Sequence, residues 1–216
     1  MSRPLPLLFL LACLAGPASG AEWGEPALWQ EATFFDALLA ARDRQARSES
    51  DPAMIAVLKA IASQASQQVA NLQQIEAYTK TQKDNLSYAF TQADPAPSLE
   101  TIGANFETLT KGNDQIRSNL YYLTARCRIA SSQALPDPEM YQAALLILGQ
   151  IQQLQLELNA LYLDGVADQR LIAENPWATS KDFRRQTELL MRSIVLIQDS
   201  VFAVYNSGYE LAMRCK

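Results

Sequence analysis

Residues 99–130 read LETIGANFETLTKGNDQIRSNLYYLTARCRIA, and this stretch decides the fold class. Its apolar residues recur at alternating steps of three and four, which is the spacing of one face of an α-helix. Asn113 is the one strongly polar residue on that face. A heptad seam of this length predicts a long helix that packs lengthwise against other helices. The seam residues are Leu99, Ile102, Phe106, Leu109, Asn113, Ile116, Leu120, Leu123, Cys127 and Ala130.

The blocks on either side carry the same spacing. Residues 52–93 contain no glycine, and their seam includes polar positions at Gln68, Thr79 and Gln82. In the block that starts at Pro138, Asp164-Gly165 is expected to end the helix and to leave a short extra helix over 166–174. The apolar seams are Leu58, Ile61, Ala65, Leu72, Ile75 and Leu86; Ala144, Ile147, Ile151, Leu154, Leu158 and Leu161; and Phe183, Leu190, Ile194, Ile197, Val201, Val204, Leu211 and Cys215.

Each long block is preceded by an acidic or amide residue followed by proline. The pairs are Asp51-Pro52, Asp94-Pro95, Asp137-Pro138 and Asn175-Pro176. Asp and Asn accept hydrogen bonds from free N–H groups at a helix start, and proline suits the first helical turn. Helices are therefore predicted to begin close to these pairs, with Ser98 as a second N-cap in the second block.

These features predict an all-α protein, an elongated up-down bundle of four long helices plus a shorter N-terminal helix. Helices of about 30–38 residues would be roughly 45–57 Å long. No turn signal flanked by alternating β-branched residues indicates a hairpin. The bundle is predicted over residues 51–216, and the N-terminal amphipathic helix, over 21–50, is assigned to the same domain.

The first 20 residues have the pattern of a cleaved signal peptide. Arg3 precedes an apolar run over 5–14, and small residues follow Pro17. This pattern predicts export to the periplasm or the extracellular space, with the mature chain starting near Ala21. Leu10-Leu11-Ala12-Cys13 resembles a bacterial lipobox, so lipidation of Cys13, as in an outer-membrane lipoprotein, is the alternative. No second hydrophobic run is long enough to predict an integral membrane span.

Two cysteines remain after the signal segment, Cys127 and Cys215. An even pair in an exported chain predicts a structural disulfide, because that compartment is oxidising. Both residues lie near the ends of blocks that should run parallel. If these blocks are diagonal in a square bundle, however, the bond requires the C-terminal tail to bend inward.

The chain lacks the residues of most catalytic centres. It contains no histidine, which excludes Ser-His-Asp catalysis and histidine-ligated zinc or haem. Its net charge of −5 argues against nucleic-acid binding. Asp164, Asp168 and Glu174 lack the spacing of a calcium loop and are expected on a solvated face. No catalytic, cofactor-binding or metal-ligating residue is predicted.

Some polar and aromatic residues still suggest contacts. Asn113 and Thr187 on the seams are interpreted as setting helix register or binding buried water, with a polar pocket as the alternative. The N-terminal helix is apolar on more than one face. It is therefore the predicted contact with a protein partner in the cell envelope, or else a fifth core helix; the contact residues are Trp29, Phe34, Phe35 and Leu38.

The leading hypothesis is a non-enzymatic extracytoplasmic adaptor or structural component of a cell-envelope or secretion assembly. Its layout resembles that of the minor pilus-tip subunits of type IV secretion systems, which are exported helical bundles. Two alternatives remain open: a secreted all-α enzyme similar to exported chorismate mutases, which bind a dianion with Arg, Lys and Glu, and a ligand-sensing periplasmic bundle. The sequence leaves the oligomeric state open.

Overall fold

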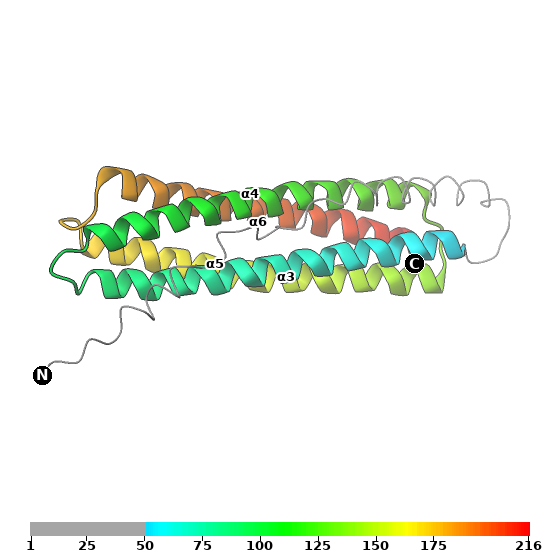
Figure 1. The fold of residues 1–216 in the computed structure, drawn as a ribbon. Coiled ribbons are helices and arrows are strands. Elements are labelled where there is room, and N and C mark those ends of the chain that lie inside the picture. Colours follow the sequence, from blue (N-terminus) through cyan, green and yellow to red (C-terminus); the bar gives the residue numbers. More distant parts are fainter. Residues whose placement is uncertain (1–50) are drawn as a thin grey trace, which may run out of the picture.

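The structure, a computed structural model, describes residues 51–216, which form a bundle of four long helices (Figure 1). They contain 38, 38, 37 and 35 residues, so each is roughly 52–57 Å long. The predicted all-α bundle is confirmed for this part of the chain. The signal segment 1–20 and the N-terminal helix 21–50 lie outside the described residues. The four helices are α3 (Pro52–Ala89), α4 (Ala96–Gln133), α5 (Pro138–Glu174) and α6 (Lys181–Cys215).

Two of the four predicted helix starts are exact. Asp51 accepts a hydrogen bond from the Ala53 N–H (2.9 Å) and caps α3, and Asp137 caps α5. Helix α4 begins two residues before Ser98, after Asp94 accepts a bond from the Ala96 N–H (3.2 Å).

The predicted start of α6 at Pro176 is wrong by five residues. Asn175 donates its side-chain amide to the Leu171 carbonyl (2.9 Å), so it closes the last turn of α5. The cap of α6 is Ser180, whose hydroxyl accepts the Phe183 N–H (3.1 Å). Asx–Pro pairs can serve either end of a helix, and the sequence pattern does not distinguish them.

The predicted end of the third helix at Asp164-Gly165 is also wrong, because α5 continues unbroken to Glu174. Gly165 lies on the buried seam, where a Cβ atom would come within 2.4 Å of the Met191 sulfur. The glycine therefore allows α5 and α6 to approach closely and is not a helix terminator here.

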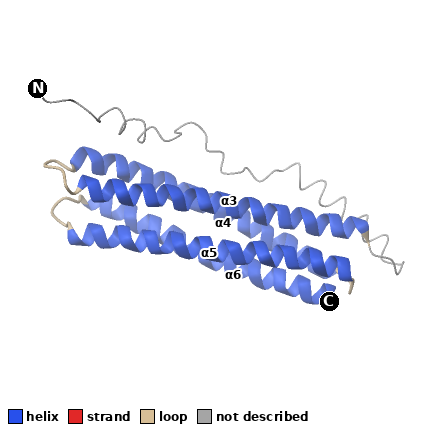
Figure 2. Cartoon of the chain, turned by 90° about the horizontal axis from the view of Figure 1, so that it is seen from below, coloured by secondary structure: helices blue, strands red, loops and turns tan. Residues whose placement is uncertain are grey.

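The helices alternate in direction, with the α3–α4 and α5–α6 turns at one end and the α4–α5 turn at the other (Figures 1 and 2). Helix α3 packs antiparallel against α4, and α5 packs antiparallel against α6. The other two neighbouring pairs are parallel, α4 with α6 and α3 with α5. The contacts that show this include Asn119–Gln68 between α3 and α4, Lys83–Asp164 and Gln73–Glu157 between α3 and α5, Asn113–Ser193 and Phe106–Phe183 between α4 and α6, and Gly208–Ile151 between α5 and α6.

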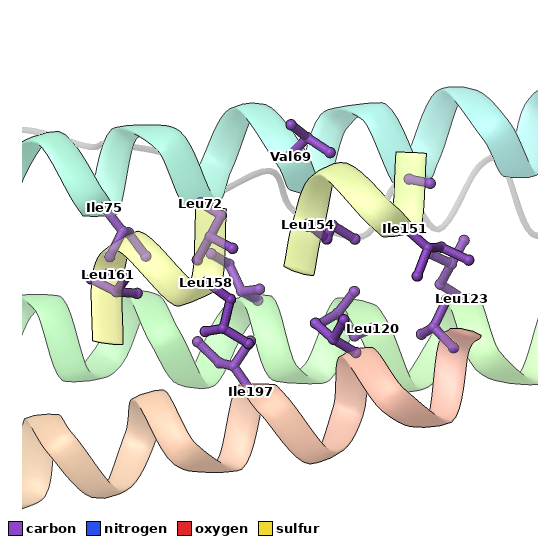
Figure 3. Packing of buried hydrophobic residues seen from close by; sticks show 14 of the residues in the cluster. Val69, Leu72, Ile75, Leu120, Leu123, Ile151, Leu154, Leu158, Leu161 and Ile197 are labelled. Carbon is purple, nitrogen blue, oxygen red and sulfur yellow. The ribbon is translucent and has the colours of Figure 1, made fainter. Parts of the chain in front are cut away.

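The core runs the whole length of the bundle and is built from the predicted seams. Figure 3 shows Leu72, Leu120, Leu158 and Ile197, one from each helix, pointing into the space between the helices. All four side chains are buried. Within residues 51–216, no helix combines the length and the apolar character needed to cross a membrane.

The predicted disulfide is not formed, and Cys127 and Cys215 are buried free thiols. The second and fourth long helices are neighbours, contrary to the diagonal arrangement considered from the sequence, but their register separates the thiols. The Arg128–Ser207 bond places Cys127 level with residue 206 of α6. Cys215 lies beyond this level, beside the α4–α5 turn, where its carbonyl accepts the Asp137 N–H (2.9 Å). The offset is about 13–14 Å along the helices, too far for a disulfide.

Both thiols are therefore expected to resist alkylation in the folded protein. Burial raises the pKa of Cys127 to about 12 and, together with the nearby Asp137, that of Cys215 to about 11, so neither forms the reactive thiolate at neutral pH. Mass spectrometry after iodoacetamide treatment should show no modification of these two residues in buffer. Two modifications are expected in denaturant without reductant; finding none there would mean that the thiols are oxidised.

Candidate functional site

The bundle interior contains little that could perform chemistry. Among the described residues, the buried polar side chains are amides and hydroxyls, with a single buried carboxyl and no buried Arg or Lys. No group of three or more metal-ligating side chains is gathered in residues 51–216. The buried set is Gln68, Asn71, Thr79, Gln82, Asn113, Asn119, Thr124, Ser131, Asp168, Thr179, Thr187, Ser193 and Ser207.

Most of these groups bond to one another or to the backbone. Between α3 and α4, the Gln68 carbonyl accepts from the amides of Asn71 (3.3 Å) and Asn119 (3.0 Å). Asn113 donates to the Ser193 hydroxyl (2.8 Å) and so links α4 to α6 in one register. Thr187 donates to the carbonyl one turn before it, at Phe183 (3.1 Å). The register interpretation of Asn113 is therefore supported.

Asp168 differs from the rest of this set because it is the one buried carboxyl among the described residues, and neither of its oxygens has a hydrogen-bond partner in the protein. The hydroxyls of Ser131 and Thr179 also lack a partner, but they carry no charge. It lies on the inward face of α5, about two turns before the helix ends at Glu174. The α3–α5 hydrogen bonds place it level with residues 84–87 of α3. The expected solvated position of Asp168 is wrong, because the continuation of α5 carries the seam through this residue.

The surroundings of Asp168 favour its neutral form. Burial is the main reason that the pKa of Asp168 is raised to about 7; the nearby Asp164 and Asp84 also raise this pKa, while Lys83 lowers it. Lys83 forms an ion pair with Asp164 across α3 and α5, and this bond is the main reason that the pKa of Lys83 is raised. Asp168 can exchange a proton near neutral pH, but its complete burial gives a substrate no access to it.

The outer surface of the bundle is more informative, and α5 is its most unusual part. Every exposed residue of α5 between positions 142 and 163 is uncharged. Glu157, the one charged residue in this range, is half-buried and accepts a hydrogen bond from Gln73 of α3 (2.9 Å). We call this surface the outer stripe of α5; it comprises Gln142, Leu145, Leu146, Gly149, Gln152, Leu156, Asn159, Tyr162 and Leu163.

A second row of exposed apolar residues runs along α6 at seven-residue spacing. We call Val195, Phe202 and Tyr209 the α6 stripe; they are 44%, 62% and 52% exposed. Val195 lies four residues after Met191, the residue that packs on Gly165, so the α6 stripe is on the side of α6 towards α5.

The two stripes are adjacent. The contacts of Gly165 and Gly208 across the two helices place Leu156 level with Phe202. By the same register, Leu163 is level with Val195. Leu156 and Leu163 are 62% and 66% exposed. Contiguous exposed apolar residues on a folded domain often mark a contact surface. Together the outer stripe of α5 and the α6 stripe form what we call the apolar face.

The contact residues predicted from the sequence, Trp29, Phe34, Phe35 and Leu38, lie outside the described residues, as does Cys13. The seam that the sequence predicts for α5, from Ala144 to Leu161, does not include the apolar face. The sequence does contain a signal for this face. Residues 140–163 include a single charged residue, and they hold more apolar residues than one inward seam requires.

Comparison with protein-family models, curated proteins and solved structures finds no significant match to this chain.

Proposed function

We propose that the protein is a non-enzymatic helical adaptor or structural component of an extracytoplasmic assembly, in the cell envelope or in a secretion system. The observation that carries this proposal is the apolar face, which gives the bundle a long surface suited to binding another protein. The predicted signal peptide supports the location. The described interior, with a single inaccessible carboxyl and no converging basic groups, offers nothing that would bind a dianionic substrate.

The α6 stripe is the part of this face expected to contact the partner most strongly. Phe202 and Tyr209 are aromatic, and aromatic side chains at an interface centre commonly contribute about 2 kcal/mol or more to binding. Neither residue contributes much to packing within the bundle, because more than half of each side chain is exposed. Replacing them should therefore affect binding and leave folding intact.

The test is photo-crosslinking in intact cells. A photoreactive phenylalanine at position 202 should give a discrete adduct with an envelope protein. The matched control is the same probe at Ser118, an exposed position on α4. With the probe at Val195, the additional change Phe202→Ser should lower the adduct yield at least tenfold at an unchanged melting temperature.

Two results would contradict the proposal. One is the absence of any protein adduct from position 202 in cells where the protein is folded and abundant. The other is recovery of the protein from the cytoplasm with its first 20 residues still attached, which would place it in the wrong compartment.

A further inference from the structure

Helix α5 has two apolar sides, and only one is covered within the described bundle. The inward seam packs against α3 and α6, while the outer stripe continues at helical spacing through Leu145, Gly149, Gln152, Leu156 and Leu163. A helix with apolar residues around most of its circumference is normally covered on both sides. The outer stripe therefore has the character of a second helix-packing seam.

We infer that the outer stripe of α5 pairs antiparallel with the same stripe of a second copy of this chain. The inference rests on the proposed function, because it assigns one half of the apolar face to a partner. It commits to a twofold-symmetric contact, in which a residue that meets a second residue of the other copy is itself met by that second residue's symmetry mate.

Steric complementarity is the first argument. If the twofold axis passes between Gln152 and Gln153, Leu156 of each copy lies opposite Gly149 of the other. A Cβ atom at Gly149 would have no neighbour within 4 Å, so the space over this glycine is open. The exposed Leu156 side chain is a knob that fits such a hole. The same axis places Leu145 opposite Ala160, a second pairing of a large residue with a small one.

Electrostatics is the second argument. The chain has a net charge of −5, so two copies repel each other overall. The outer stripe avoids this cost because none of its exposed residues is charged. At the axis, Gln152 of both copies can donate and accept hydrogen bonds with each other, since an amide carries both kinds of group.

The expected affinity is moderate. A single helix pair buries less surface than a standard protein–protein interface, so dissociation in the micromolar range is expected. Sedimentation of the purified protein should show a monomer–dimer equilibrium. Leu156→Glu should weaken dimerisation at least tenfold, because it places two carboxylates beside the other copy's stripe. Phe202→Ser, on the α6 stripe, should leave the dimer affinity within about twofold of the wild-type value.

Cysteine cross-linking tests the register. Gln152→Cys should form a disulfide-linked dimer on mild oxidation, because the two copies of this residue meet near the axis. Ser66→Cys, exposed on α3, is the matched control and should not cross-link. The two cysteines of the described bundle, Cys127 and Cys215, are buried and are not expected to cross-link.

A further variant distinguishes steric fit from non-specific hydrophobic association. Gly149→Leu adds apolar surface and removes a helix-weakening glycine, yet it fills the hole and should lower dimer affinity at least tenfold. Tighter dimerisation by this variant would overturn the proposed register.

Self-pairing would be overturned if the protein sedimented as a monomer at all concentrations and Gln152→Cys formed no disulfide-linked dimer. In that case residues 23–50 or another protein would cover the stripe. The adduct from position 202 is measured independently, so this result would leave the proposed function standing.

Discussion

Replacement of Asp168 by Asn is expected to stabilise the bundle by about 3–4 kcal/mol at pH 8, which corresponds to roughly 6–16 °C in melting temperature. At that pH the wild-type protein must hold a fully buried carboxylate without a hydrogen-bond donor, or unfold to hydrate it. Asn has nearly the same shape and carries no charge, so the variant avoids this cost.

The sign of the pH dependence follows from the direction of the pKa shift. The pKa of Asp168 rises from an ordinary value of 3.8 to about 7 on folding. Between these values the folded state holds more protons than the unfolded state, so wild-type stability falls as pH rises. The advantage of Asp168→Asn should be near zero below pH 4, grow between pH 4 and 7, and remain constant above about pH 7.5.

Chemical denaturation of both proteins at half-unit intervals from pH 4 to 8 measures this difference. Asp199→Asn is the control, because Asp199 is an exposed carboxyl on the neighbouring helix α6. Its effect should stay within about 0.5 kcal/mol at every pH. A constant difference between wild type and Asp168→Asn would mean that Asp168 is solvated or paired in solution.

Phe106→Ala is expected to destabilise the protein by about 3–5 kcal/mol, the usual loss for a buried aromatic residue. Phe106 is completely buried on the α4 seam, and its ring lies 5.7 Å from that of Phe183 on α6. Truncation would leave a cavity between two long helices, which cannot collapse locally. Urea unfolding monitored by circular dichroism gives the free-energy change.

Phe202→Ala is the matched control, since it removes the same side chain from an exposed position on α6. Its effect should be below about 0.5 kcal/mol. A double-mutant cycle of Phe106 and Phe183 should also show coupling of about 0.5–1.5 kcal/mol, because the two rings touch across α4 and α6. Additive effects would contradict the placement of α4 beside α6.

Particular residues show where sequence reasoning succeeded. The seam from Leu99 to Ala130 is buried at every position, and Asp51 and Asp137 cap helices as predicted. These features depend on spacing and on hydrogen bonds within one turn, which are local properties. The errors at Gly165 and Asn175 have the same origin: each residue is compatible with a helix end, but only the neighbouring helix or turn decides its role.

The burial of Asp168 and the separation of the two thiols depend on contacts between residues that are distant in the sequence. Whether Asp168 is solvated depends on α3 packing over the last turns of α5, and whether Cys127 meets Cys215 depends on the register of α4 against α6.

By itself, the sequence determined that this protein is a bundle of long helices, because heptad spacing and helix caps act within a few residues of one another. Only the tertiary structure decided which helices are neighbours and in what register they lie. A heptad seam repeats every seven residues, so it packs almost equally well in several registers and against more than one partner. Contacts between distant residues, such as Asn113 with Ser193 and Gly165 with Met191, select one arrangement. That selection buries Asp168, separates the thiols and leaves the outer stripe of α5 exposed on the described bundle.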